Sequence, residues 1–116
     1  QTKIWMVNGK NDDASHAHIC EEYGKKMKAS GADIEVTTKA GWGHGFTANY
    51  EAEYESDQEK WHDCPDYYTE DDGMPNKDAK IDASCITYGY HIGGTNESWK
   101  HFSRPFKKFF IENLLK

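Results

Sequence analysis

The chain has 116 residues, of which 36% are hydrophobic and 14% aromatic, and its formal net charge is −6. This length fits one domain, and the aromatic content excludes a disordered chain. The acidic charge argues against nucleic acid as a partner, because proteins bind DNA and RNA by neutralising phosphates with basic side chains. No apolar run reaches the roughly 18 residues of a transmembrane helix. We therefore expect neither a nucleic-acid nor a membrane partner.

The first 38 residues predict a strand, a helix and a second strand. Residues 3–7 (KIWMV) are a short apolar run, as in a buried strand. The helix is expected to start at Ser15 as its N-cap and to stop at Gly31, with apolar side chains recurring every fourth residue between them. Residues 32–38 then alternate apolar and polar side chains. A strand, helix and strand of this length predict a parallel pair of strands.

The predicted fold class is α/β, with parallel strands, flanking helices and an incomplete sheet. A parallel pair needs cover on both faces, and two strands alone do not make a stable sheet. The chain also begins at Gln1, without Met, and enters a strand almost at once. These features favour residues 1–116 as the C-terminal part of a single domain whose other strands, and any export signal, lie upstream.

The second half of the chain combines an acidic insertion with a closing helix. Residues 48–96 are acidic and rich in turns; within them 50–62 predicts a helix and 71–76 (DDGMPN) a loop tip. A last helix is expected at about 97–115, with a stripe of aromatic side chains along it. Pro105 predicts either the start of that helix or a kink.

Three cysteines are present. Cys20 lies on the apolar side of the first helix and is expected to be a small core residue. Cys64 and Cys85 flank the turn-rich stretch, and either form a disulfide or remain two free thiols, since spacing alone does not decide the connectivity. A disulfide would favour an extracytoplasmic location. The triplet at 96–98 (NES) fits a glycosylation acceptor, a pattern that is frequent by chance.

The residues that carry chemistry follow the two predicted strands. In an open parallel sheet the carboxyl ends of the strands meet at one rim, where active sites lie. Asp12 follows the first strand by a few residues, and His44 follows the second in a glycine loop. A carboxylate on one imidazole nitrogen fixes the tautomer, so that the other nitrogen accepts the proton of a hydroxyl or thiol nucleophile. We therefore expect Asp12 and His44 to be a catalytic acid and base.

Each of these residues has a simpler alternative role. Asp12 also suits a turn or a helix cap. Asp13 competes for the same acid role, although its expected place is near the helix N-terminus, where an anion is favoured. Trp42 and Phe46 either line a pocket or pack the loop around His44.

The ordered set of these motifs resembles the end of the dienelactone hydrolase family of α/β-hydrolases. The resemblance rests on Gly9-Lys10-Asn11-Asp12, on Gly31-Ala32-Asp33 and on Gly41-Trp42-Gly43-His44-Gly45-Phe46. It covers residues 3–47 well and 97–115 loosely, and nothing is carried over to 48–96. It implies hydrolysis of an ester or lactone bond in a small-molecule substrate, with Asp12 as the acid in a G-x-x-D motif and His44 as the base in a G-x-x-H-G-F loop.

One departure from the family is serious. In α/β-hydrolases the nucleophile precedes the acid and sits on a G-x-S-x-G elbow. No such elbow precedes Asp12; the segment 89–93 (GYHIG) has the glycine spacing but carries His91 in its centre, and Cys64 and Cys85 follow the base. The nucleophile, a Ser or Cys, is therefore expected in a missing N-terminal portion of the same fold or in another chain, and the 116 residues alone are expected to be inactive.

Two other function classes remain open. The first is a non-catalytic α/β-hydrolase-like binding or interaction module. The second is a metal-binding domain built on histidines; His16 and His18, however, stand two apart and are expected to point to different faces of a helix. The sequence therefore predicts no metal and no cofactor.

Overall fold

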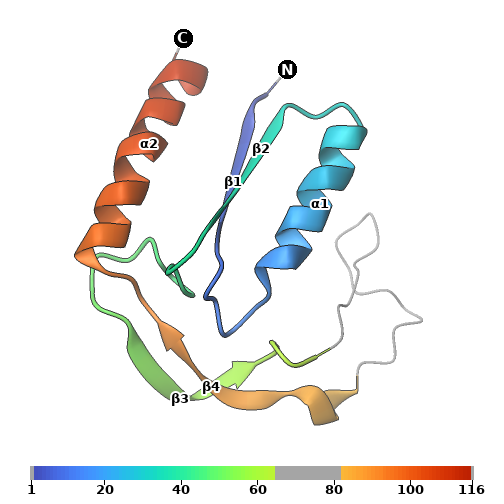
Figure 1. Ribbon diagram of the computed structural model, residues 1–116, viewed down its shortest axis with the longest axis vertical. Helices are drawn as coiled ribbons and strands as arrows, with labels where there is room; N and C mark the ends of the chain where they lie inside the picture. The colour runs from blue at the N-terminus through green and yellow to red at the C-terminus, as the bar shows by residue number, and fades with distance from the viewer. Residues whose placement is uncertain (1, 65–81, 116) are drawn as a thin grey trace.

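The computed structural model describes residues 2–64 and 82–115 (Figure 1). The predicted loop tip at 71–76 lies outside the described residues. In chain order the elements are β1 (Ile4–Gly9), α1 (Ala17–Ala29), β2 (Ile34–Lys39), β3 (Glu53–Lys60), the 3-10 turn η1 (Ala83–Cys85), β4 (Thr87–Ile92) and α2 (Asn96–Leu114). They form two separate two-stranded sheets, β1–β2 and β3–β4.

The predicted parallel pair is confirmed. β1 and β2 run side by side from Ile4 opposite Ile34 to Gly9 opposite Lys39. The helix between them, α1, begins at Ala17 after the N-cap His16, whose side chain makes no capping hydrogen bond. The expected cap at Ser15 was wrong, because both its backbone N–H and its hydroxyl donate to the carboxylate of Asp12 in the preceding turn.

The two helices lie on opposite sides of the β1–β2 pair (Figure 1). On one side Gly24 of α1 is buried against Val36 of β2, and a Cβ at this position would overlap the Val36 side chain. On the other side Trp5 of β1 contacts α2, with ring centroids 6.1 Å from Phe102 and 5.7 Å from Phe109. Trp5 and Val36 face opposite ways because successive side chains of a strand alternate between its two faces.

The closing helix α2 spans Asn96–Leu114, which confirms the helix expected at about 97–115. Of the two alternatives for Pro105, a helix start at that residue was wrong, because the helix begins before it. Thr95 caps the helix through a reciprocal capping box with Ser98, in which each side chain accepts a hydrogen bond from the other residue's backbone N–H. Ser98 is only 5% exposed, and its hydroxyl also lies 3.1 Å from the carbonyl of Phe46. This cap fixes the helix start, and the helix continues through Pro105.

The expected helix at 50–62 was also wrong, because β3 occupies this segment. β3 pairs antiparallel with β4, from Glu53 opposite Ile92 to Lys60 opposite Thr87, with an irregularity between Glu55 and Glu59. A helix here would place acidic side chains four residues apart, which is unfavourable. The Thr, Tyr and Ile side chains of β4 suit a strand, and pairing with it decides the conformation of β3.

The core of the described part is thin. No described side chain is less than 2% exposed, and the buried apolar residues are Ala14, Ile34 and Cys64. The Cα radius of gyration is 16.1 Å, whereas a compact domain of this length has about 13 Å. Large side chains on α2 remain open to solvent, among them Trp99 at 39% and Phe106 at 46%. Within the described residues, therefore, β1–β2 is a small sheet with a single helix on each face.

Candidate functional site

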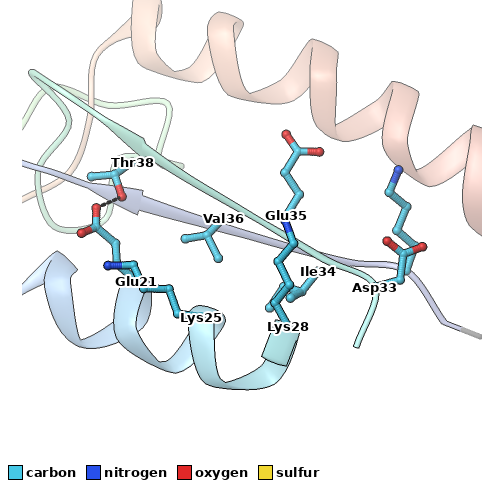
Figure 2. Close-up of a pocket in the computed structure, with 10 residues that line it drawn as sticks. Glu21, Lys25, Lys28, Asp33, Ile34, Glu35, Val36 and Thr38 are labelled. Carbon is cyan, nitrogen blue, oxygen red and sulfur yellow. Dashed lines mark hydrogen bonds between the residues drawn. The ribbon is translucent and has the colours of Figure 1, made fainter. Parts of the chain in front are cut away.

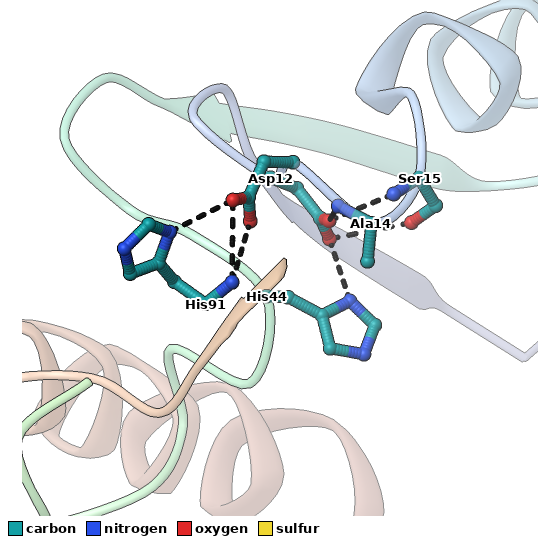
Figure 3. Close-up of polar contacts among 6 residues, drawn as sticks. Asp12, Ala14, Ser15, His44 and His91 are labelled. Carbon is teal, nitrogen blue, oxygen red and sulfur yellow. Dashed lines mark hydrogen bonds and ion pairs between the residues drawn. The ribbon is translucent and has the colours of Figure 1, made fainter. Parts of the chain in front are cut away.

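The structure brings Asp12 and His44 together at the carboxyl ends of β1 and β2 (Figure 3). Asp12 Oδ2 lies 3.0 Å from His44 Nδ1, and the two side chains are 16% and 36% exposed. The other oxygen, Asp12 Oδ1, accepts from the backbone N–H groups of Ala14 and Ser15, each at 2.9 Å. Asp12 thus orders its own turn, the simpler role considered for it, and the same side chain also contacts the imidazole of His44.

The loops that carry Asp12 and His44 are joined by hydrogen bonds from Asn11 and Gly41. Asn11 N–H donates to the Trp42 carbonyl at 2.9 Å, and Gly41 N–H donates to Asn11 Oδ1 at 2.6 Å. Gly9 makes the close approach possible, since a Cβ there would collide with the backbone of Trp42 and Gly43. Sequence reasoning missed Asn11; its only sequence signal is an amide side chain in the turn before Asp12.

Asp13 does not compete with Asp12 for His44, because its carboxylate contacts another histidine, His91. His91 Nδ1 lies 2.8 Å from Asp13 Oδ2, and the His91 backbone N–H donates to both carboxylate oxygens, at 3.1 and 3.2 Å. Burial of Asp13 opposes its ionisation, but these hydrogen bonds outweigh it and hold the pKa of Asp13 below its ordinary value. Asp13 was expected to lie near the N-terminus of α1 as a favourable anion. Instead, its carboxylate contacts His91 of β4.

The end of β4 also supports the loop that carries His44. His44 and Ile92 form an isolated parallel bridge, and Gly93 N–H donates to the His44 carbonyl at 2.9 Å. The ring of Tyr90 meets the His44 ring edge-on, with centroids 5.1 Å apart. The segment 89–93, whose glycine spacing had suggested a comparison with a nucleophile elbow, therefore supports the loop that carries His44.

A hollow of about 340 Å³ opens beside the imidazole of His44. Cys20 lines it and is half-buried, so it is less enclosed than the core position expected for it. Among the described residues, the side-chain amide nitrogen of Asn8 is the buried side-chain polar atom with no hydrogen-bond partner, and Asn8 lines the same hollow. The full lining is Val7, Asn8, Gly9, Asp12, Ser15, His16, Ala17, Cys20, His44, Gly45, Phe46 and Thr47.

A larger hollow, of about 610 Å³, lies between α1 and β2 (Figure 2). Its lining is mostly charged, with Lys25 and Lys28 from α1 and Glu35 from β2, and contains neither a histidine nor a cysteine. Thr38 donates to Glu21 across it at 2.5 Å. This charged hollow contains neither Asp12 nor His44, so it is separate from their contact.

The aromatic residues next to His44 pack the loop and also border a cavity. Trp42 and Phe46 stack with ring centroids 4.7 Å apart, and Phe46 meets Phe102 of α2 edge-on at 5.6 Å. Both rings also line a hollow of about 240 Å³ that includes Asp13. Both roles considered for Trp42 and Phe46 are therefore present.

Cys64 and Cys85 form a disulfide, with their Cα atoms 4.9 Å apart. The bridge ties the residues after β3 to those before β4, and it leaves neither sulfur as a thiol nucleophile. Cys20 is the free cysteine. No helix in the described ranges is both long enough and apolar enough to span a bilayer.

The histidines near the start of α1 cluster instead of pointing apart. The ring centroids of His16 and His18 lie 4.9 Å apart, and those of His16 and His62 lie 3.8 Å apart with the rings tilted by 38°. The expectation of different faces was wrong because His16 is the N-cap, with an extended backbone, and is not inside the helix. Within residues 2–64 and 82–115, no group of at least three His, Cys, Asp or Glu side chains is arranged to hold a metal ion.

The chain matches no protein-family model, no curated protein and no solved structure. Its function is therefore inferred from the geometry of the site and from the motifs that form it.

Proposed function

We propose that the chain supplies the acid and base of an α/β-hydrolase that cleaves ester or lactone bonds, similar to dienelactone hydrolases. The observation that carries the proposal is the 3.0 Å contact between Asp12 Oδ2 and His44 Nδ1. The second oxygen of Asp12 is held by two backbone N–H groups. This arrangement orients a carboxylate toward an imidazole, as an acid–base pair requires.

The chemistry follows from which imidazole nitrogen is occupied. With Asp12 ionised, Nδ1–H donates to its carboxylate, and Nε2 keeps a lone pair. Nε2 of His44 then accepts the proton of a Ser or Cys nucleophile as that atom attacks the acyl carbon. The imidazolium, stabilised by Asp12, returns the proton to the leaving alkoxide. Water, activated by the same nitrogen, hydrolyses the acyl-enzyme and releases the acid.

The nucleophile is proposed to come from a missing N-terminal portion of the same fold or from another chain. Cys64 and Cys85 are joined in a disulfide and cannot act as thiols. Asn8 lines the open hollow beside His44, and its side-chain amide nitrogen is buried without a hydrogen-bond partner. A buried polar atom without a partner is costly, and a further segment that packs into this hollow would complete the site. The donors that stabilise the oxyanion would arrive with that segment.

An oxidising compartment is the proposed location. The Cys64–Cys85 disulfide supports it, because disulfides persist mainly outside the reducing cytosol. Measuring the free thiols of the protein as isolated without reductant tests this point: one thiol, at Cys20, is expected. Three free thiols would contradict it.

The proposal is tested on the protein purified from its native source with its accompanying chains. Hydrolysis of short p-nitrophenyl esters is measured, and a fluorophosphonate or iodoacetamide probe labels the nucleophile for peptide mass spectrometry. We expect ester hydrolysis and labelling of a Ser or Cys outside the 116 residues. The His44→Ala form should lose both, whereas His101→Ala, a change at an exposed histidine of α2, should keep them. Unchanged hydrolysis in His44→Ala would refute the proposed role of His44 in an ester hydrolase. Absence of any hydrolysis in the unmodified protein would favour the non-catalytic binding module.

A further inference from the structure

We infer that Asp13 and His91 are a positioning pair, through which strand β4 of the insertion sets the geometry of Asp12 and His44. The inference rests on the proposed function, because it assigns a role in the same reaction. The insertion shows no resemblance to the hydrolase family, so nothing in the family pattern assigns this role.

The first contact of the pair is with the loop that carries the acid. Asp13 directly follows Asp12, and the two carboxylates contact different histidines: Asp13 contacts His91, and Asp12 contacts His44. Three hydrogen bonds hold the Asp13 carboxylate on β4: one to the His91 ring and two from its backbone N–H. A residue 78 positions later in the chain thereby anchors the turn from which Asp12 projects.

The second contact is with the loop that carries the base. Ile92, the residue after His91, forms the bridge with His44, and Gly93 N–H donates to the His44 carbonyl. Gly45 makes this approach possible, since it has a φ of +70° and a Cβ there would lie 3.2 Å from Gly93 N. Successive residues of one strand therefore hold the acid loop and the base loop.

Anchoring both loops on adjacent residues fixes the distance between the catalytic side chains. Acid–base transfer is sensitive to such placement, and a displacement of about 1 Å can lower a rate by roughly two orders of magnitude. The pair itself is exposed, with 61% of the His91 side chain and 35% of the Asp13 side chain open to solvent. Exposed ion pairs contribute little to overall stability. Loss of the pair is therefore expected to affect the site more than the fold.

The test compares Asp13→Ala, Asp13→Asn and His91→Ala with a matched control, Asp63→Ala. Asp63 also pairs with a histidine of the insertion, His62, at 3.3 Å, and its other partners, Lys60 and Thr87, belong to β3 and β4. In the ¹⁵N-labelled chain, NMR reports the tautomer of His44 and the exchange rate of its Nδ1 proton. In the protein with its nucleophile, ester hydrolysis reports kcat and KM separately.

We expect Asp13→Ala to accelerate exchange of the His44 Nδ1 proton and to lower kcat about tenfold with KM unchanged. Asp13→Asn should recover part of the loss, because its amide oxygen still accepts from the His91 backbone N–H. His91→Ala should show a smaller loss, since its backbone N–H remains. Asp63→Ala should match the wild type in every measurement.

A wild-type His44 spectrum in both Asp13 variants would overturn the inference. Should Asp13→Ala fail to fold, Asp13→Asn and His91→Ala still decide the question. Failure of the proposed function is a different result: His44→Ala would then leave hydrolysis unchanged, while the NMR comparison would still show whether Asp13 positions His44. An equal effect of Asp63→Ala would also overturn the inference, because it would show a general effect of charge.

Discussion

Asp12 Oδ2 and His44 Nδ1 lie 3.0 Å apart although 32 residues separate them in the chain. The contact arises because β1 and β2 are parallel and end at the same rim, with Gly9 opposite Lys39. The turn after each strand then needs only a few residues to bring its side chain to the other. The parallel pair is therefore what makes this acid–base contact possible.

The first prediction concerns the carboxylate of Asp12. Asp12→Asn keeps the shape of the side chain but places an amide beside His44, which favours the wrong imidazole tautomer. We expect kcat for ester hydrolysis to fall by about 10⁴, with the far-UV circular dichroism unchanged. Asp33→Asn, an isosteric change just before β2, serves as the control. A fall of less than tenfold in Asp12→Asn would contradict the assignment.

The second prediction concerns Cys20, whose free thiol lines the same hollow as His44. If the nucleophile comes from another segment, Cys20→Ala should retain hydrolysis within about twofold, because it removes only packing atoms. The measurement is kcat/KM with a p-nitrophenyl ester, together with probe labelling. Loss of both in Cys20→Ala would identify Cys20 as the nucleophile and remove the need for a further segment.

The third prediction concerns the contact between α1 and β2. A methyl group at Gly24 would overlap the side chain of Val36, so Gly24→Ala should lower the free energy of unfolding by about 1–3 kcal/mol. Denaturant unfolding measures the change. The double change Gly24→Ala with Val36→Ala should recover part of the loss, because it removes the overlapping methyl groups. Stabilisation by Gly24→Ala alone, as expected from helix propensity without the contact, would contradict this packing.

The fourth prediction concerns the disulfide between Cys64 and Cys85, which closes a separation of 21 residues. Replacing both cysteines by serine should lower the free energy of unfolding by about 3 kcal/mol, because the unfolded chain regains the freedom of this loop. Denaturant unfolding with and without reductant provides the measurement. Reductant should destabilise the wild type and Cys20→Ser equally, and should leave Cys64→Ser/Cys85→Ser unchanged. If reductant also lowered the free energy of unfolding of the double variant, its effect on the wild type could not be assigned to this disulfide.

The fifth prediction concerns the pH dependence contributed by Asp13. Burial opposes its ionisation, but the hydrogen bonds from His91 prevail and lower its pKa below the ordinary value of 3.8. The folded state therefore releases this proton more readily than the unfolded state. The contribution of Asp13 to the free energy of unfolding is therefore fully present above about pH 5. It is lost as the pH falls below the unfolded-state pKa of 3.8 and through the lower pKa of the folded state. The stability difference between wild type and Asp13→Asn should shrink over that range, and a constant difference would contradict the prediction.

The sequence by itself determined the elements whose signals are local. The apolar run of β1, the helical spacing of α1 and the alternation of β2 predict a parallel pair, and the positions of Asp12 and His44 just after the two strands predict their proximity. These features depend on side chains close in sequence and on a general rule of connection between parallel strands. The contact between Asp12 and His44 was therefore within reach of sequence reasoning.

Only the tertiary structure decided the features that depend on distant partners. The segment 50–62 has helical composition, but β4 pairs with it and makes it a strand. Asp13 looked like a residue for the helix N-terminus, yet His91, 78 positions away, holds its carboxylate. The cysteine pairing and the support of His44 by Ile92 likewise join residues far apart in sequence. No local pattern encodes such contacts, because their free energy is gained only when the remote segment is already in place.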